Sequence, residues 1–309
     1  MNAVELIQFL LLLLSLPLYI LFLTTIIRFR DREPFNSDFF TLSLSLGVVD
    51  VFSLLNGWLL YKFPSFGWLG LPYLVRRFPI LAKICIMTSW ECSINQHLSI
   101  AFLALNRFTG IVTPLRHPLI WTGKFVALVI VLEWSLPLIA VIPQTQLPYG
   151  YVEDNATQHL TKPLWLDHWA QTMYFYCFLT FNVTINLLTL IVYLVIFNQL
   201  RKHAGTFNKN ELKMAVYGFC VFLIMFLYGV YALLRANMPK DDPEMYNWLV
   251  LLYGVCNDVF SWCNPWLCLL LMGRVRRHMI ALLRGQDYTE TVPIELLQQQ
   301  PSIAKTEAK

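Results

Sequence analysis

The sequence has 309 residues, of which 57% are hydrophobic and only 14% are charged, and its mean hydropathy is +0.55. Such a chain has too little polar surface to cover its apolar residues in water, so we predict an integral membrane protein rather than a soluble globule. The net charge of +4 is small, and most basic residues flank apolar runs. The lipid bilayer is therefore the expected partner, and nucleic acid is not.

Seven apolar runs reach the length of a membrane-spanning helix, which is about 17 to 25 residues. They lie at about 4–27, 39–61, 84–106, 125–142, 170–197, 214–234 and 248–272. Charges, Pro, Gly or Asn separate each run from the next, and no internal repeat is evident. We therefore expect an all-α membrane protein whose single domain, residues 1–285, is a seven-transmembrane helix bundle.

The two ends of the chain have different predicted roles. The first run is too long for a signal peptide, and Met1 to Glu5 carry no positive charge, so we expect a retained first span. Residues 274–284 have one apolar side and several arginines elsewhere, which predicts a short amphipathic helix on the inner membrane surface. Residues 286–309 have little to bury and are expected to form a mobile cytoplasmic tail.

The distribution of Lys and Arg predicts the orientation in the membrane. With the N-terminus outside, sixteen of the 23 basic residues fall on inner loops and the tail, and seven fall on outer loops. The positive-inside rule therefore favours an extracellular N-terminus and a cytoplasmic C-terminus. The sequon Asn155-Ala156-Thr157 lies in the longest outer loop, about 143–169, so we expect a glycan on Asn155. The same loop, which is rich in aromatic residues and proline, is expected to cover the bundle or to anchor helix ends at the interface.

The third run carries a polar stripe along its whole length. On an α-helix, Ser89, Ser93, Gln96 and Arg107 fall close to one line. Eighteen residues separate Ser89 from Arg107, which corresponds to roughly 27 Å, close to the hydrocarbon thickness of a bilayer. Because such a stripe is unfavourable against lipid, we expect it to face other helices or water.

Four carboxylates lie well inside predicted spans, namely Asp50, Glu91, Glu133 and Asp258. No Lys or Arg is predicted at a comparable depth, so these groups should be protonated, hydrogen-bonded, or facing a cation or water. Glu91 and Glu133 have no evident partner and no functional interpretation.

Asp50 is placed to meet polar residues of two other spans. The expected network comprises Asp50, Gln96, Ser261, Asn264 and Pro265. It has two interpretations, a conformational switch or hydrogen bonding that only holds helices together. Pro265 interrupts the seventh span, which predicts either a hinge or a static kink.

Several motifs together resemble the rhodopsin-like G-protein-coupled receptors. They are Asn106-Arg107-Phe108 at the end of the third span, Leu46 to Asp50 in the second, and Asn264-Pro265-Trp266-Leu267 in the seventh. Within that class the chain is most similar to the nematode serpentine chemoreceptors, and Pro114, His117 and Trp134 point to the serpentine receptor class V group.

The resemblance implies a chemosensory receptor without a cofactor that binds a small extracellular molecule and activates a heterotrimeric G protein. A homo- or heterodimer is compatible with it. It assigns G-protein coupling to Arg107, with Asn106 beside it. The expected ligand site comprises Ser89, Trp90, Ser93 and Asp258, where the Asp258 carboxylate would contact the ligand or instead hydrogen-bond to a neighbouring helix.

The chain departs from the usual pattern of that class at several positions. Asn106 replaces an acidic residue, so the ionic clasp within the motif is absent, and Cys268 replaces a tyrosine. The second outer loop has no cysteine to pair with Cys85. These departures affect the details of the switch rather than the class.

Three other functions are possible for a membrane protein of this size, and the sequence argues differently about each. An enzyme is not expected, because no nucleophile–base pair or metal-ligand cluster is evident. A retinal protein would need a lysine in 248–272, and there is none. A transporter or channel for small solutes or cations is the alternative, because intramembrane carboxylates can couple to protons or cations.

Overall fold

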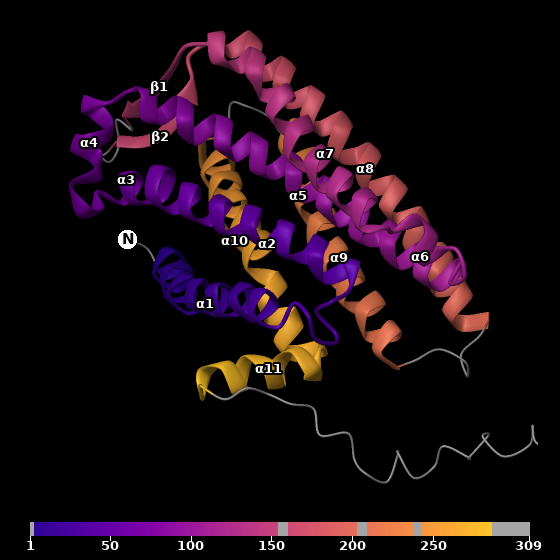
Figure 1. Cartoon of the computed structure of the whole chain (residues 1–309). Helices are drawn as coiled ribbons and strands as arrows, with labels where there is room; N and C mark the ends of the chain where they lie inside the picture. Colours follow the sequence, from indigo (N-terminus) through magenta and orange to yellow (C-terminus); the bar gives the residue numbers. More distant parts are fainter. Residues whose placement is uncertain (1–2, 154–159, 203–208, 238–242, 286–309) are drawn as a thin grey trace, which may run out of the picture.

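The computed structural model describes residues 3–153, 160–202, 209–237 and 243–285, and the statements below concern those residues. Seven long helices correspond to the seven apolar runs. They are α1 (Ala3–Arg28), α2 (Asp38–Asn56), α5 (Ile80–Val112), α7 (Gly123–Val141), α8 (His168–Lys202), α9 (Lys209–Asn237) and α10 (Pro243–Leu271). They pack into one bundle, in which α5 runs through the middle and contacts α2, α7, α8 and α9 (Figure 1).

Polarity separates the helices that face the bilayer from those inside the bundle. Five helical segments, ending at Arg28, Phe66, Gln146, Lys202 and Leu234, are long and apolar enough to cross a membrane. Helices α1, α7 and α8 expose many large apolar side chains, as expected of surfaces that contact lipid. Helix α5 instead buries the consecutive polar residues Asn95, Gln96 and His97. Helix α5 therefore places these polar residues in the interior of the bundle.

The second span is longer than the sequence predicted and is not uniformly α-helical. Helix α2 continues through a π-helical turn, η1 (Gly57–Lys62), into α3 (Phe63–Phe66), where Gly67 adopts φ +74° and ends the helix. A left-handed residue at this position is a common helix stop. A short 3-10 turn, η2 (Trp68–Gly70), and α4 (Leu71–Arg77) then lead to α5.

The long loop before α8 has regular structure that the sequence reading did not predict. After the 3-10 turn η3 (Ile142–Gln146), the antiparallel strands β1 (Tyr149–Glu153) and β2 (Leu160–Trp165) form a hairpin. The hairpin packs on α5, α3 and η1 at one end of the bundle (Figure 1). The Tyr151 hydroxyl donates to the Leu60 carbonyl at 2.8 Å, which ties the hairpin to the π-helical turn. Burial raises the pKa of Tyr149 to about 12, so its hydroxyl stays protonated and donates to the Gln144 carbonyl at 2.9 Å.

Two short helices lie at the opposite end. Helix α6 (His117–Ile120) follows α5, and α11 (Gly273–Leu283) follows α10. Helix α11, which corresponds to the predicted amphipathic helix, packs beside α1 and α10 and runs across this end (Figure 1). Its His278 ring contacts the rings of Phe29 and Phe35 at centroid distances of 4.9 and 5.1 Å.

Candidate functional site

The polar side chains of α2, α5 and α10 meet around one buried carboxylate. The amide of Gln96 donates to Asp50 Oδ1 at 2.6 Å, and the amide of Asn264 donates to Asp50 Oδ2. Tyr19 of α1 also donates its hydroxyl to Oδ2. Asp50 is only 1% exposed, so every one of these contacts replaces a lost interaction with water. The sequence reading placed Gln96 and Asn264 at this point but missed Tyr19.

Ser261 extends this network towards the outer end. Its hydroxyl accepts from the Gln96 amide at 3.3 Å and donates to Ser53 Oγ at 3.3 Å. Pro265 lies inside α10 directly after Asn264. The five residues expected to form the network are thus grouped in space, across three helices. Their role as a switch remains a proposal.

Arg107 is held at the inner end of α5 by neighbours from two other helices. Its guanidinium donates to Asn106 Oδ1 at 2.6 Å and to Glu211 Oε2 at 3.0 Å, and it lies 4.6 Å from the centre of the Phe39 ring. Arg107 is 4% exposed, whereas the Glu211 side chain is 39% exposed. The motif itself lacks an acidic residue, and an ion pair with α9 takes that place. In the sequence, the one indication that Glu211 could pair with Arg107 is that it stands three residues before the predicted 214–234 run.

The half of the bundle next to the hairpin corrects the prediction that no cation lies near the buried carboxylates. Asp258 of α10 forms an ion pair with Lys62, and the two residues are 2% and 7% exposed. The sequence predicts that Lys62 lies outside the membrane, because the apolar run ends at residue 61. In the structure the helix continues to Phe66, and the π-helical turn directs Lys62 into the bundle. The Lys62 ammonium also lies 4.4 Å from the centre of the Trp58 ring.

A small cavity adjoins this ion pair. Its volume is about 30 Å³, and its lining includes Lys62, Ser89, Gly254 and Asn257. The Ser89 hydroxyl accepts from the Asn56 amide at 2.8 Å and donates to the Cys85 carbonyl at 2.8 Å. Of the four predicted ligand-site residues, the structure therefore brings Ser89 and Asp258 to the same region.

Trp90 and Ser93 lie apart from this cavity. The Trp90 ring packs against Trp165 of the hairpin and Phe178 of α8, at centroid distances of 5.8 and 5.2 Å. The Ser93 hydroxyl is buried and has no hydrogen-bond partner within the described residues. Trp90 thus supports the hairpin, and it faces a different neighbour from Ser89.

Glu133 has partners that the sequence reading did not find. Ser45 of α2 donates its hydroxyl to Glu133 Oε2 at 2.9 Å, and the Trp134 indole donates to Ser45 Oγ at 3.1 Å. This cluster links α7 to α2. Glu91 accepts a weak contact from the Cys92 thiol, at 3.5 Å, and its Oε1 has no hydrogen-bond partner within the described residues.

A comparison with known families decides the class of this protein. The family model for the serpentine type 7TM GPCR chemoreceptor Srv matches residues 8–284. The chain belongs to the Srv chemoreceptor family. A relative, serpentine receptor class V-1 of Caenorhabditis elegans, is 26% identical over 251 residues, which cover 80% of each chain. The predicted resemblance and the seven-transmembrane fold are thus confirmed.

Srv membership makes the protein a multi-pass membrane protein of a chemosensory receptor family, whose members are generally not enzymes. Within the described residues, no group of three His, Cys, Asp or Glu side chains is arranged to hold a metal ion. The seven cysteines, Cys85 included, are free thiols. Asn155 and the predicted tail 286–309 lie outside the described residues.

Proposed function

We propose that this protein is a plasma-membrane chemosensory receptor that binds a small extracellular molecule in the outer half of the bundle and activates a heterotrimeric G protein at the inner end. Membership of the Srv family supports the chemosensory role. The observation that carries the coupling role is Arg107, a buried cation held at the inner end of α5 by Asn106 and Glu211. A partner helix that replaces Glu211 would gain a preorganised guanidinium.

Helix α5 connects the proposed ligand region to Arg107. Ser89 and Arg107 lie on the same continuous helix, so they are separated by roughly 27 Å. The ligand site centres on Ser89 and Asp258, whereas Ser93 and Trp90 do not line the cavity and Trp90 supports the hairpin. The ligand acts by binding one arrangement of the bundle more tightly than the other. Between the two ends, the network around Asp50 acts as the switch, and Pro265 is the weak point of α10.

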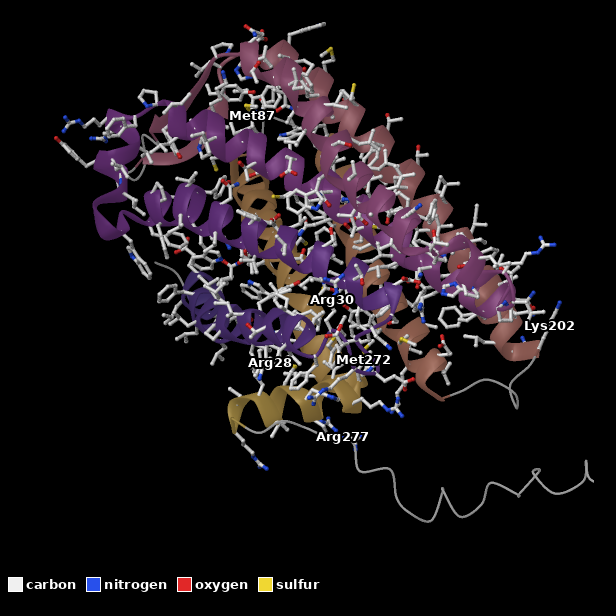
Figure 2. The ribbon with its side chains drawn as sticks, viewed as in Figure 1. Arg28, Arg30, Met87, Lys202, Met272 and Arg277 are labelled. Carbon is white, nitrogen blue, oxygen red and sulfur yellow. The ribbon has the colours of Figure 1, made fainter. Side chains whose placement is uncertain are left out.

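The proposed orientation has the N-terminus outside and the C-terminus in the cytoplasm. Figure 2 supports it, because the basic residues Arg28, Arg277 and Lys202 lie away from Met87 and the hairpin end. The positive-inside rule assigns the end with these residues to the cytoplasm. Asn155 would then carry a glycan. An epitope tag after Lys309 should be reached by antibody only after cells are permeabilised, and treatment with a glycosidase should reduce the apparent mass of the wild type but not of Asn155→Gln. Labelling of the tag in intact cells would contradict this orientation.

The coupling role is tested by nucleotide exchange on purified G proteins, with membranes that contain the receptor. We expect Arg107→Ala to abolish exchange while surface expression persists. Arg107→Lys should restore little, because a point charge replaces a planar group with five donors. Full exchange with Arg107→Ala would refute the proposed coupling role. Solute uptake without any exchange would favour the transporter instead.

A further inference from the structure

The cavity beside Lys62 has an excess of hydrogen-bond donors. An ammonium carries three protons, and Lys62 directs one of them to Asp258. Gln8 of α1 is 5% exposed, and its amide nitrogen has no hydrogen-bond partner within the described residues. A buried amide without a partner is unfavourable, so it is expected to serve a ligand or a water molecule.

Gly254 shows that these two donors face the same space. A methyl group on Gly254 would lie 3.9 Å from Gln8 Nε2, 3.9 Å from Lys62 Nζ and 3.7 Å from Lys62 Cε. The space above Gly254 is therefore bordered by an unpaired amide and an ammonium, which come from different helices. Gly254 itself, like Lys62 and Ser89, lines the cavity.

We propose that this cavity and the adjoining space above Gly254 bind the carboxylate group of a small acidic molecule, held by Lys62 and Gln8. The inference rests on the proposed function and names the chemical class of its ligand. A carboxylate offers only acceptors, which match the ammonium of Lys62 and the unpaired amide of Gln8. An amine would bring a second cation beside Lys62 and would compete with it for Asp258. A cavity of about 30 Å³ has the size of one small polar group, so the hydrocarbon part of the ligand lies outside it.

The ligand carboxylate and Asp258 then compete for one ammonium. Lys62 belongs to the second span, and Asp258 belongs to α10. Occupation of the cavity weakens the ion pair that joins these helices, because two anions share one cation. This competition gives a ligand different affinities for the joined and separated arrangements, which is what a signalling ligand requires.

Binding is measured as the rise in melting temperature of the purified full chain, which needs no G protein. The compounds are acetate, propionate, butyrate and hexanoate, each with its matching primary amide and amine. We expect at least one carboxylate to raise the melting temperature at concentrations where its amide and amine do not. Stabilisation by amines, or equal effects of acid and amide, would overturn the proposal, as would the absence of any effect of the acids.

Variants then locate the site. Gly254→Ala should abolish the carboxylate effect, because its methyl group fills the cavity at ordinary contact distances, whereas Gly123→Ala, with no atom within 4 Å, is the matched control. Asp258→Asn should bind the carboxylate about tenfold more tightly, since the competing anion is gone. Lys62→Gln alone is expected to destabilise the fold, because it leaves Asp258 buried without its partner. The double variant Lys62→Gln with Asp258→Asn removes both charges. Carboxylates should not raise the melting temperature of this double variant. An unchanged response in Gly254→Ala and in the double variant would overturn the assignment.

The two proposals fail in different ways. If carboxylates raise the melting temperature but no condition yields nucleotide exchange, the ligand site stands and the receptor mechanism fails. If exchange depends on Arg107 but no carboxylate stabilises the chain, the mechanism stands and the assignment of the ligand class is wrong.

Discussion

The Tyr217 hydroxyl donates to Asn264 Oδ1 at 3.1 Å, and both side chains are buried. Through Asn264 this contact reaches Asp50. On its other side, the Tyr217 ring packs edge-on against Phe39, with centroids 5.8 Å apart, and Phe39 lies beneath the Arg107 guanidinium. Tyr217 of α9 therefore stands between the polar network around Asp50 and Arg107 near the end of α5.

Tyr217→Phe tests that position, because it removes one hydroxyl and keeps the ring. An interhelical hydrogen bond in a membrane contributes about 0.6–1.7 kcal/mol. Since the bond belongs to the arrangement in which Arg107 is paired with Glu211, its loss should raise basal nucleotide exchange about fivefold. Tyr73→Phe is the control, because Tyr73 is 71% exposed. Unchanged exchange in Tyr217→Phe would mean that this hydrogen bond does not distinguish the two arrangements.

Glu211→Gln should also raise basal exchange, because it frees Arg107 while leaving the bond to Asn106 in place. The increase should stay below about fivefold, since partly exposed ion pairs contribute at most about 1 kcal/mol. High salt should produce a similar increase in the wild type by screening the pair. Glu33→Gln is the control, because Glu33 pairs with Arg274 only at the surface. A fall in exchange would show that Glu211 itself contacts the G protein.

Glu133 should matter for stability through its acceptor oxygen rather than its charge. We expect Glu133→Gln to melt near the wild-type temperature, because the amide oxygen still accepts from Ser45. Glu133→Leu should reduce the free energy of unfolding by about 1–3 kcal/mol, because the buried Ser45 hydroxyl loses its acceptor. Thermal melts in detergent measure both. Equal melting temperatures for the two variants would contradict the prediction.

Gly229→Ala should destabilise the contact between α9 and α8. A methyl group there would lie 2.5 Å from Asn182 Oδ1 and 3.0 Å from Asn186 Nδ2, and both asparagines are buried. The shifts that accommodate such overpacking reduce the free energy of unfolding by about 1–3 kcal/mol. Gly123→Ala, where the new methyl group meets no atom within 4 Å, should melt like the wild type. A similar melting temperature for both alanine variants would show that α8 moves aside freely.

The helices were predictable because each is a continuous apolar run about as long as the bilayer is thick. Such a run can be recognised from neighbouring residues in the sequence alone. Asp50, Gln96 and Asn264 were also predictable, since a polar residue deep in a span must find a partner in another span. Tyr19 was missed because an aromatic ring in an apolar run gives no sign that its hydroxyl is used.

Two of the errors share a physical cause, which is that hydropathy cannot locate a helix end. Lys62 and Glu211 both lie just outside predicted runs, yet each supplies the charge that a buried residue needs. In the sequence, a charged residue at the edge of an apolar run marks the predicted end of the membrane span. In the folded protein, a specific partner can hold the same residue inside the bundle. The hairpin was missed for a different reason, because Pro163 lies within its second strand and weakens the strand pattern.

The π-helical turn also has a consequence for how the second span can vary. A π-helical turn takes in one more residue than an α-helical turn, so removing one residue from 57–62 would restore regular α-helix. The side chains beyond it would keep their direction, because the wide turn already accommodates the extra residue. Winding the same six residues as regular α-helix would instead rotate those side chains by about 100°, and Lys62 would turn away from Asp258. Asp50, which precedes the turn, would keep its orientation. The end of this helix beyond the turn can thus be re-aimed by a change in winding alone, independently of the half that carries Asp50.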